Sequence, residues 1–138
     1  MEKVLAFGTF DILHLGHIYF LKKAKKLGKE LIVVIARDEN VKKIKGKKPL
    51  HNERERAEIL KALKFVDKVV LGDKKNFFKK IAQIKPDVIA LGYDQKVDKE
   101  KLEKAIKKCN KKIKVVRIGR FKDHKYKTSK IKERIRNE

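Results

Sequence analysis

The chain has 138 residues, a length typical of one domain, and its 40 Lys and Arg residues against 18 Asp and Glu residues give a formal net charge of +22. A hydrophobic share of 41% is enough for a packed core, and no apolar run approaches the ~20 residues of a membrane-spanning helix. The single cysteine, Cys109, excludes an internal disulfide, and the first residues lack a signal-peptide pattern. We therefore expect one cytoplasmic domain over residues 1–138, with no membrane association.

The basic charge has two explanations. It favours polyanionic ligands such as nucleic acids or phosphorylated metabolites, but lysine-rich surfaces also occur in heat-adapted proteins. Lysines are densest at residues 42–48 and from residue 107 onward, without interleaved aromatic residues and without an RRM, KH or zinc-finger pattern. Charge alone therefore gives nucleic-acid binding little support.

In the first half of the chain, apolar runs alternate with amphipathic stretches. Residues 4–7 predict a buried strand, residues 16–27 a helix, and residues 31–36 a second strand. Residues 37–50 are polar and lysine-rich, which predicts an irregular connection. Asn52 then resembles an N-cap for a helix over residues 53–64, whose first turn contains two glutamates.

The same alternation continues in the second half. Residues 66–71, 88–91 and 113–118 predict strands, and residues 76–84 and 98–108 predict the helices between them. Thr128 and Ser129 begin a short last helix. This order predicts an α/β fold, a Rossmann-like doubly wound five-stranded parallel sheet with helices on both faces. Ligands of such sheets bind beyond the carboxyl ends of the strands, here the loops after residues 7, 36, 91 and 118.

The loop after the first strand contains the most informative motif, GTFDILHLGH at residues 8–17. It is neither a G-x-G-x-x-G nor a Walker A motif. Gly8 permits a tight turn, and Thr9 and Phe10 offer a hydroxyl and a backbone N–H to phosphate oxygens. His14 and His17 flank a glycine where a helix begins, a place that favours anions. The alternative is that the two histidines have only a structural role, as caps or as half-buried packing residues.

This motif resembles the signature of the HxGH nucleotidyltransferase superfamily, in its cytidylyltransferase-like branch. The similarity continues at four further segments: ARDENVKKIKGKKPL, ERERAEILKALKFVDKVVLG, LGYDQ and TSKIKERI. Two families of the branch are similar to the chain, archaeal FAD synthase (FMN adenylyltransferase) and bacterial glycerol-3-phosphate cytidylyltransferase. The pattern ARDxxVxxxKGxxP and LGYDQ resemble the FAD synthase more, whereas TSKIKERI fits either.

The resemblance implies a nucleotidyltransferase without a covalent intermediate. The acceptor phosphate attacks the α-phosphate of a nucleoside triphosphate in line, and pyrophosphate leaves. Catalysis then consists of positioning and charge stabilisation. The leading expectation is ATP + FMN → FAD + pyrophosphate, and the alternative is CTP with glycerol 3-phosphate or another phospho-alcohol. A divalent cation, nominally Mg²⁺, would arrive with the triphosphate, and no protein ligand is assigned to it. The resemblance also implies a homodimer.

By match to the family motifs, His14, His17 and Lys45 are the expected catalytic residues. The nucleotide-binding set, which includes the two histidines again, is Gly8, Thr9, Phe10, His14, Leu15, Gly16, His17, Lys42, Arg56, Gly92, Asp94, Thr128 and Ser129. Lys42 and Lys45 are chosen from a lysine run that is otherwise a solvated loop.

Three of these assignments have explicit alternatives. Asp11 either orients a histidine or lysine without contacting the ligand itself, or caps its own loop. Arg56 either contacts phosphate or forms an ion pair on a helix surface. Asp94 either accepts from the ribose or base or forms a turn after Gly92. A flavin needs an aromatic slot, and the residues available for its wall are Phe10, Tyr19, Phe20, Tyr93, Phe121 and Tyr126.

Two functions of other classes remain as competitors. A nucleic-acid-binding module predicts affinity that falls steeply with salt and does not depend on His14. A nucleotide-binding regulator predicts stabilisation by nucleotide without turnover.

Overall fold

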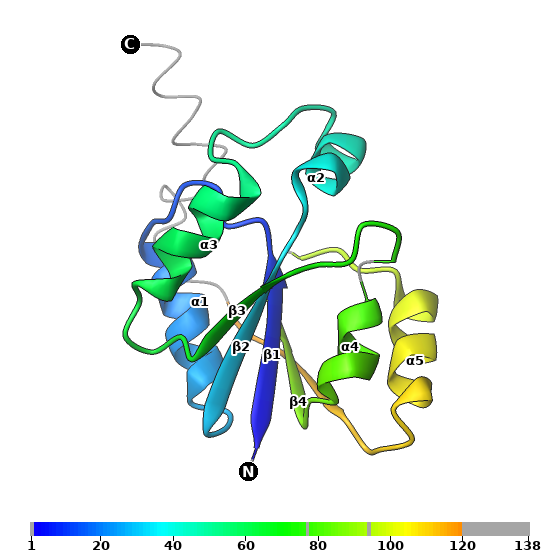
Figure 1. Ribbon diagram of the computed structural model, residues 1–138. Helices are drawn as coiled ribbons and strands as arrows, with labels where there is room; N and C mark the ends of the chain where they lie inside the picture. The colour runs from blue at the N-terminus through cyan, green and yellow to red at the C-terminus, as the bar shows by residue number, and fades with distance from the viewer. Residues whose placement is uncertain (1, 77, 94, 120–138) are drawn as a thin grey trace.

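The computed structural model describes residues 2–76, 78–93 and 95–119. The described elements are, in chain order, β1 (Lys3–Gly8), α1 (Leu15–Lys25), β2 (Glu30–Ile35), α2 (Asp38–Lys45), α3 (Glu53–Lys61), β3 (Lys68–Leu71), α4 (Lys79–Ile84), β4 (Val88–Leu91), α5 (Lys99–Lys108) and β5 (Lys114–Arg117). The strands form one parallel sheet in the order β3-β2-β1-β4-β5 (Figure 1). The predicted doubly wound, five-stranded parallel sheet is confirmed.

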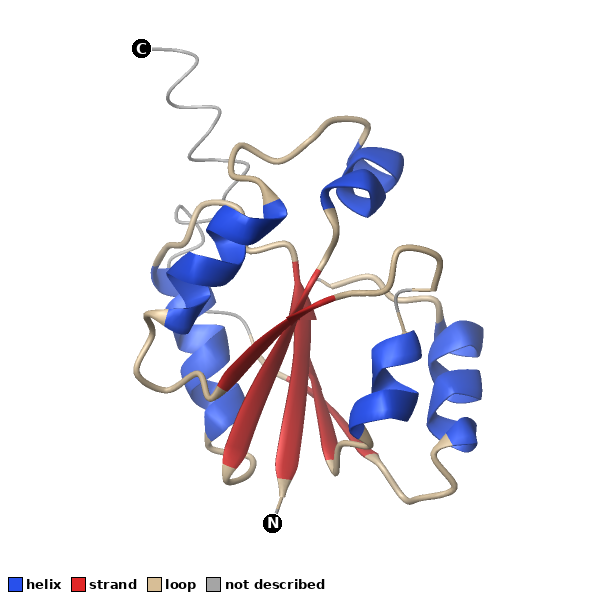
Figure 2. Ribbon diagram, viewed as in Figure 1, coloured by secondary structure: helices blue, strands red, loops and turns tan. Residues whose placement is uncertain are grey.

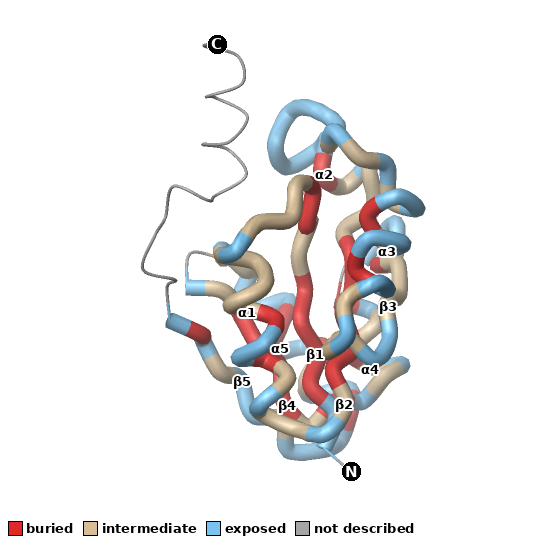
Figure 3. Tube along the Cα trace, turned by 90° about the vertical axis from the view of Figure 1, so that its left-hand side faces the viewer, coloured by how far each residue is buried: buried red, intermediate tan, exposed pale blue. Residues whose placement is uncertain are grey.

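Helices cover both faces of the sheet. Helices α1 and α3 lie on one face, and α4 and α5 lie on the other (Figure 2). Successive side chains of β1 enter opposite cores because strand residues alternate between faces: Val4 and Ala6 pack on the α1 side, Leu5 and Phe7 on the α4 side. Burial therefore runs nearly unbroken along β1 and β2, as is typical of parallel strands (Figure 3).

The strand order changes direction at β1. The chain moves from β1 through β2 to β3 on one side and then crosses to β4 and β5 on the other. The loops that follow β1 and β4 therefore separate at their carboxyl ends and leave a crevice between them. This is the edge at which the motif of residues 8–17 lies.

The predicted irregular connection at residues 37–50 is wrong, because residues 38–45 form helix α2. The helix buries one residue, Val41, so it lacks the apolar stripe from which helices are usually recognised. It instead has acidic residues in its first turn and lysines in its last, the order that stabilises a helix dipole. It ends at Gly46, which adopts the left-handed conformation at φ 82°.

Helix α4 begins three residues later than the pattern predicts. Asp73 Oδ1 accepts the backbone N–H groups of Lys75 and Asn76 at 2.9 Å each, and Asn76 Oδ1 accepts that of Phe78 at 3.2 Å. These side chains hold a turn where a first helical turn was expected.

Some of the predicted site residues, and one predicted helix, lie outside the described residues. They are Asp94, Phe121, Tyr126 and the last helix with Thr128 and Ser129. Within the described part of the chain, none of the helices has both the length and the apolar character needed to cross a membrane.

Candidate active site

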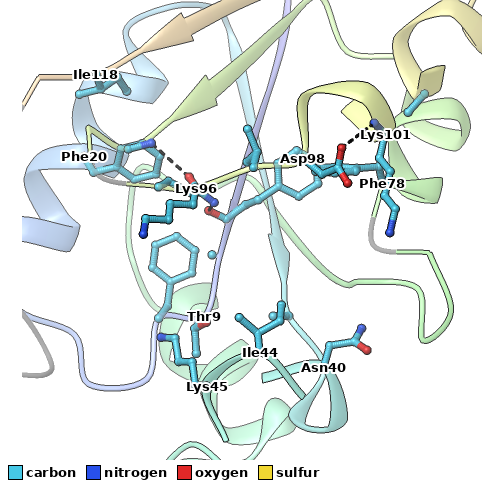
Figure 4. Close-up of a pocket in the computed structure, with 18 of the residues that line it drawn as sticks. Thr9, Phe20, Asn40, Ile44, Lys45, Phe78, Lys96, Asp98, Lys101 and Ile118 are labelled. Atoms are coloured by element: carbon cyan, nitrogen blue, oxygen red, sulfur yellow. Dashed lines mark hydrogen bonds between the residues drawn. The ribbon is translucent and has the colours of Figure 1, made fainter. Parts of the chain in front are cut away.

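A cavity of about 1080 Å³ opens at the carboxyl ends of β1 and β4 (Figure 4). The loop after β1, helix α2 and the loop after β4 all contribute to its wall. The predicted site residues in its lining are Gly8, Thr9, Phe10, His14, Gly16, His17, Lys45 and Gly92. The structure thus brings most of the described candidates together, whereas Asp11, Leu15, Lys42 and Arg56 lie outside the lining.

His14 is both the N-cap of α1 and a group directed at a ligand. Its Nδ1 accepts the backbone N–H of Gly16 at 3.1 Å, so in the neutral ring the proton resides on Nε2. Nε2 is buried and has no hydrogen-bond partner among the described residues. Burial lowers the pKa of His14, which favours this neutral form. His14 lines the cavity, and an anionic oxygen that reaches Nε2 would satisfy this donor.

His17 extends the same arrangement. Its Nδ1 accepts the backbone N–H of His14 at 3.4 Å, and the two imidazole centroids are 4.0 Å apart. The ring of Phe10 packs edge-on to His17 at 5.5 Å. Both histidines are therefore held at the first turn of α1, and both line the cavity.

Gly8 and Phe10 form a strained corner. Phe10 adopts φ 51°, an uncommon conformation for a bulky residue, and its side chain is buried. A Cβ on Gly8 would lie 2.5 Å from the ring of Phe10. Glycine is therefore required at position 8 for the ring to fold back under the end of β1.

Gly16 provides space for the side chain of His14. A Cβ at this position would meet His14 Cε1 at 2.9 Å. The missing side chain thus leaves room for the imidazole, a role that the sequence did not reveal.

Arg56 is completely buried beneath the loop after β1. Its Nη1 donates to the carbonyl oxygen of Thr9 at 2.8 Å, and its Nε donates to the carbonyl oxygen of His51 at 3.1 Å. Its Nη2 pairs with the carboxylate of Asp38 at 2.7 Å. Arg56 therefore joins α3, the start of α2 and the motif loop.

Asp11 also holds a loop. Its two carboxylate oxygens accept the backbone N–H groups of Leu50 and His51, each at 2.8 Å. These bonds correspond to the capping alternative and fix the segment between α2 and α3 against the motif.

The cavity is strongly basic. Among the described residues, eight lysines line it, from α2, α4, α5 and the loops beside them, and Asp98 is the one carboxylate. Lys45 is in this lining, whereas Lys42 contributes its carbonyl oxygen to the N–H of Gly46 at the end of α2. Such a wall suits a ligand with several negative charges.

Gln95 is a site residue that sequence analysis missed. Its side-chain amide donates to the carbonyl oxygen of Phe7 at 3.1 Å and accepts the N–H of Gly92 at 3.1 Å. It thereby ties the loop after β4 to the end of β1. The segment LGYDQ contains it, but an amide in a turn gives no signal of a cross-strand contact.

The described residues contain no group of three or more His, Cys, Asp or Glu side chains placed to hold a metal ion. The many lysines of the cavity do not suit a cation either.

Comparison with known proteins adds the family. The family model described as cytidylyltransferase-like matches residues 5–134. The chain belongs to the cytidylyltransferase-like family. Among its curated relatives, an FAD synthase of Archaeoglobus profundus is 50% identical over 98% of this chain and 86% of its own length. An FAD synthase of Ferroglobus placidus is 51% identical over 98% of this chain and 88% of its own length.

A solved structure agrees with this cytidylyltransferase-like fold. It is described as a lipopolysaccharide core biosynthesis protein of Thermoplasma volcanium, is 46% identical, and has a TM-score of 0.80 over 88% of this chain and 98% of its own. An FAD synthase of the same organism is 43% identical over 98% of this chain. The resemblance inferred from the HxGH motif is confirmed.

Proposed function

We propose that the chain is an FMN adenylyltransferase, which forms FAD and pyrophosphate from ATP and FMN. The observation that carries the proposal is about 50% identity, over 98% of the chain, to proteins named FAD synthase. The cavity supports it independently, because His14, His17 and eight lysines line one space. We place the reaction in the cytoplasm.

In this proposal, the chain supplies positioning and charge. An oxygen of the FMN phosphate attacks the α-phosphorus of ATP, the bond from that phosphorus to the β-phosphate oxygen breaks, and pyrophosphate leaves with the electrons. His14 Nε2 and His17 stabilise the charge that develops on the phosphates, at a helix start whose dipole favours anions. Lys45 and Thr9 bind the same groups from α2 and the motif loop. A divalent cation carried by ATP would neutralise part of the triphosphate charge, and it would be held mainly by phosphate oxygens and water.

Asp94, Thr128 and Ser129 remain proposed nucleotide-binding residues by match to the family motifs. Lys42 and Leu15 also remain proposed nucleotide-binding residues, although both lie outside the cavity lining. The three hydrogen bonds of Arg56 support a positioning role, in which it holds the Thr9 carbonyl so that the motif loop keeps its shape. A homodimer is part of the proposal, and light scattering on the purified protein tests it.

The decisive experiment measures pyrophosphate release with ATP or CTP, each with FMN, glycerol 3-phosphate or buffer, and identifies the product by chromatography. We expect FAD from ATP and FMN alone. His14→Ala should lower kcat by about 10²–10³, the typical cost of losing one charge-stabilising donor. His51→Ala is the matched control, because that histidine lies outside the cavity lining.

Other outcomes would contradict the proposal in distinct ways. CDP-glycerol from CTP would keep the chemistry and replace both substrates. Nucleotide binding without any product would favour the regulator. Salt-sensitive nucleic-acid binding without nucleotide binding would favour the nucleic-acid-binding module.

A further inference from the structure

The cavity has room for a large ligand or for two adjacent ones. Its volume of about 1080 Å³ lies at the upper end of the ~300–1,000 Å³ range of ligand pockets. The histidines line the side next to α1, with Phe20 and Ile118 nearby, whereas Phe78, Asp98 and Lys101 lie at the opposite end (Figure 4). This opposite end, between α4 and α5, has no part in the phosphate chemistry described above.

The α4–α5 end has an apolar floor. Phe78 is 8% exposed, and the ring of Phe7 packs against it edge-on at 5.6 Å, which fixes its plane. Ala82 of α4 and Ala105 of α5 also line this end, and their small side chains leave width between the helices. A flat floor with small flanking residues fits a planar ring rather than a compact polyol.

Ile44 supplies a wall across from this floor. It projects from α2 toward the cavity (Figure 4) and is 83% exposed, the highest exposure among the large apolar side chains of the described chain. Its neighbours in the sequence are lysines, so its exposure is not part of an apolar patch of the helix. A single exposed apolar side chain is common on protein surfaces, and what distinguishes Ile44 is its place in the lining of this cavity, where a ligand can contact it.

The rim supplies polar recognition. Lys79 of α4 and Lys101 and Lys104 of α5 line the same end. Their ammonium groups are donors, which suits a ring with carbonyl and imine acceptors along one edge. A ligand with such a ring and a phosphate tail would place the phosphate toward Lys45 and Thr9, where the reaction occurs.

We infer that the α4–α5 end of the cavity is the acceptor slot, that it holds the isoalloxazine ring of FMN between Phe78 and Ile44, and that Ala82 and Ile44 select this ring over smaller phospho-alcohols. The inference rests on the proposed function. It assigns the ring of the acceptor to the face of the sheet opposite α1, with its phosphate directed at the histidines.

Two variants probe the slot from opposite sides. Ala82→Leu fills it from α4, and Ile44→Ser removes the apolar wall from α2 without disturbing the core. Their matched controls are Gln83→Leu, on the exposed face of α4, and Leu50→Ser, a side chain 67% exposed that lies outside the cavity lining. The readouts are KM for FMN, KM for ATP, and quenching of FMN fluorescence in the presence of a non-hydrolysable ATP analogue.

Each slot variant should raise KM for FMN about tenfold or more, as expected when an apolar pocket changes by a few methylene groups, and leave KM for ATP within twofold. FMN quenching should weaken in parallel, and both controls should match the wild type. A wild type that makes FAD, with slot variants that keep its KM for FMN or change KM for ATP instead, would overturn the slot while leaving the proposed function intact. A wild type that makes no FAD and does not quench FMN would overturn the proposed function and the slot together.

Discussion

At the scale of single residues, a substitution of Gly16 should affect stability and catalysis differently. Alanine is favoured over glycine in a helix by about 1 kcal/mol. However, a Cβ at position 16 would lie 2.9 Å from His14 Cε1, the end of a side chain that can move. The strain is therefore relieved by displacing the imidazole rather than the backbone.

We expect Gly16→Ala to change the thermal midpoint little, because the gain in helix propensity is offset when the displaced His14 Nδ1 loses its cap bond from the Gly16 N–H. It should lower kcat at least tenfold, because a small displacement of a catalytic donor is costly. Melting curves and FAD formation under saturating substrates measure the two effects. A variant with wild-type kcat would show that the position of His14 is not critical.

The sequence predicted the types of residue at the site better than their contacts. His14, His17 and Gly8 were recognised because the motif is local: a strand end, a turn and a helix start lie within ten residues. The contacts of Arg56 and Gln95 join residues 47 and 88 positions apart, at Thr9 and Phe7, and no local pattern encodes them. Arg56 is buried because of tertiary packing, and the helix pattern alone would place it on the surface.

At the scale of elements, α2 shows which signal was missed. The four other described helices have apolar positions that recur at helical spacing and were predicted, with shifts at their ends. Helix α2 buries Val41 alone and contacts the sheet little, so its five-lysine neighbourhood was taken for a solvated loop. The order of Asp38 and Glu39 before Lys42 and Lys43 was a usable signal, since it complements the helix dipole.

The starts of α2 and α3 are held together by reciprocal bonds. Glu53 accepts the N–H of Asp38 at 3.0 Å, and Asp38 accepts that of Glu53 at 3.2 Å. Arg37 adds an ion pair with Glu53 at 2.8 Å. Arg56 connects this pair of helix starts to the motif loop through Asp38 and Thr9.

Removing Arg56 should therefore destabilise the whole assembly of α2, α3 and the loop. We expect Arg56→Ala to lower the free energy of unfolding by about 3–5 kcal/mol, because it removes a fully buried guanidinium from its ion pair and leaves the carbonyl oxygens of Thr9 and His51 without this donor. Urea denaturation measures it. Arg54→Ala, at an exposed position of the same helix, should change the value by less than about 0.5 kcal/mol. A loss for Arg56→Ala as small as that of the control would show that solvent replaces the three bonds.

At the scale of the whole molecule, two aspartates stabilise the end of the sheet at which the strands begin. Asp67, before β3, accepts the N–H of Leu31 at 2.7 Å and pairs with Lys25. Asp87, before β4, accepts the N–H of Lys3 at 2.8 Å and pairs with Lys111. The two carboxylates thus set the register of β2 and β1 at the end of the sheet opposite the cavity.

Both carboxyl groups have a pKa lowered from the ordinary value of 3.8. For Asp67 the main cause is the hydrogen bond from Lys25, followed by that from the backbone of Leu31. For Asp87 it is the hydrogen bond from Lys111, followed by that from the backbone of Lys3. A lowered pKa means that the folded state favours the charged form, so the stabilisation is fully present above pH 3.8 and is lost as the pH falls through the folded-state pKa values.

The double variant Asp67→Asn/Asp87→Asn keeps an acceptor at each position and removes the charge. We expect its thermal midpoint to lie about 2–5 °C below that of the wild type at pH 7, since exposed ion pairs contribute modestly, and the gap to narrow as the pH falls below 3.8. Glu2→Gln/Glu103→Gln changes the net charge equally at exposed positions and controls for the added positive charge on a chain of +22. A gap that stays constant between pH 7 and pH 2 would show that the two side chains act through shape rather than charge.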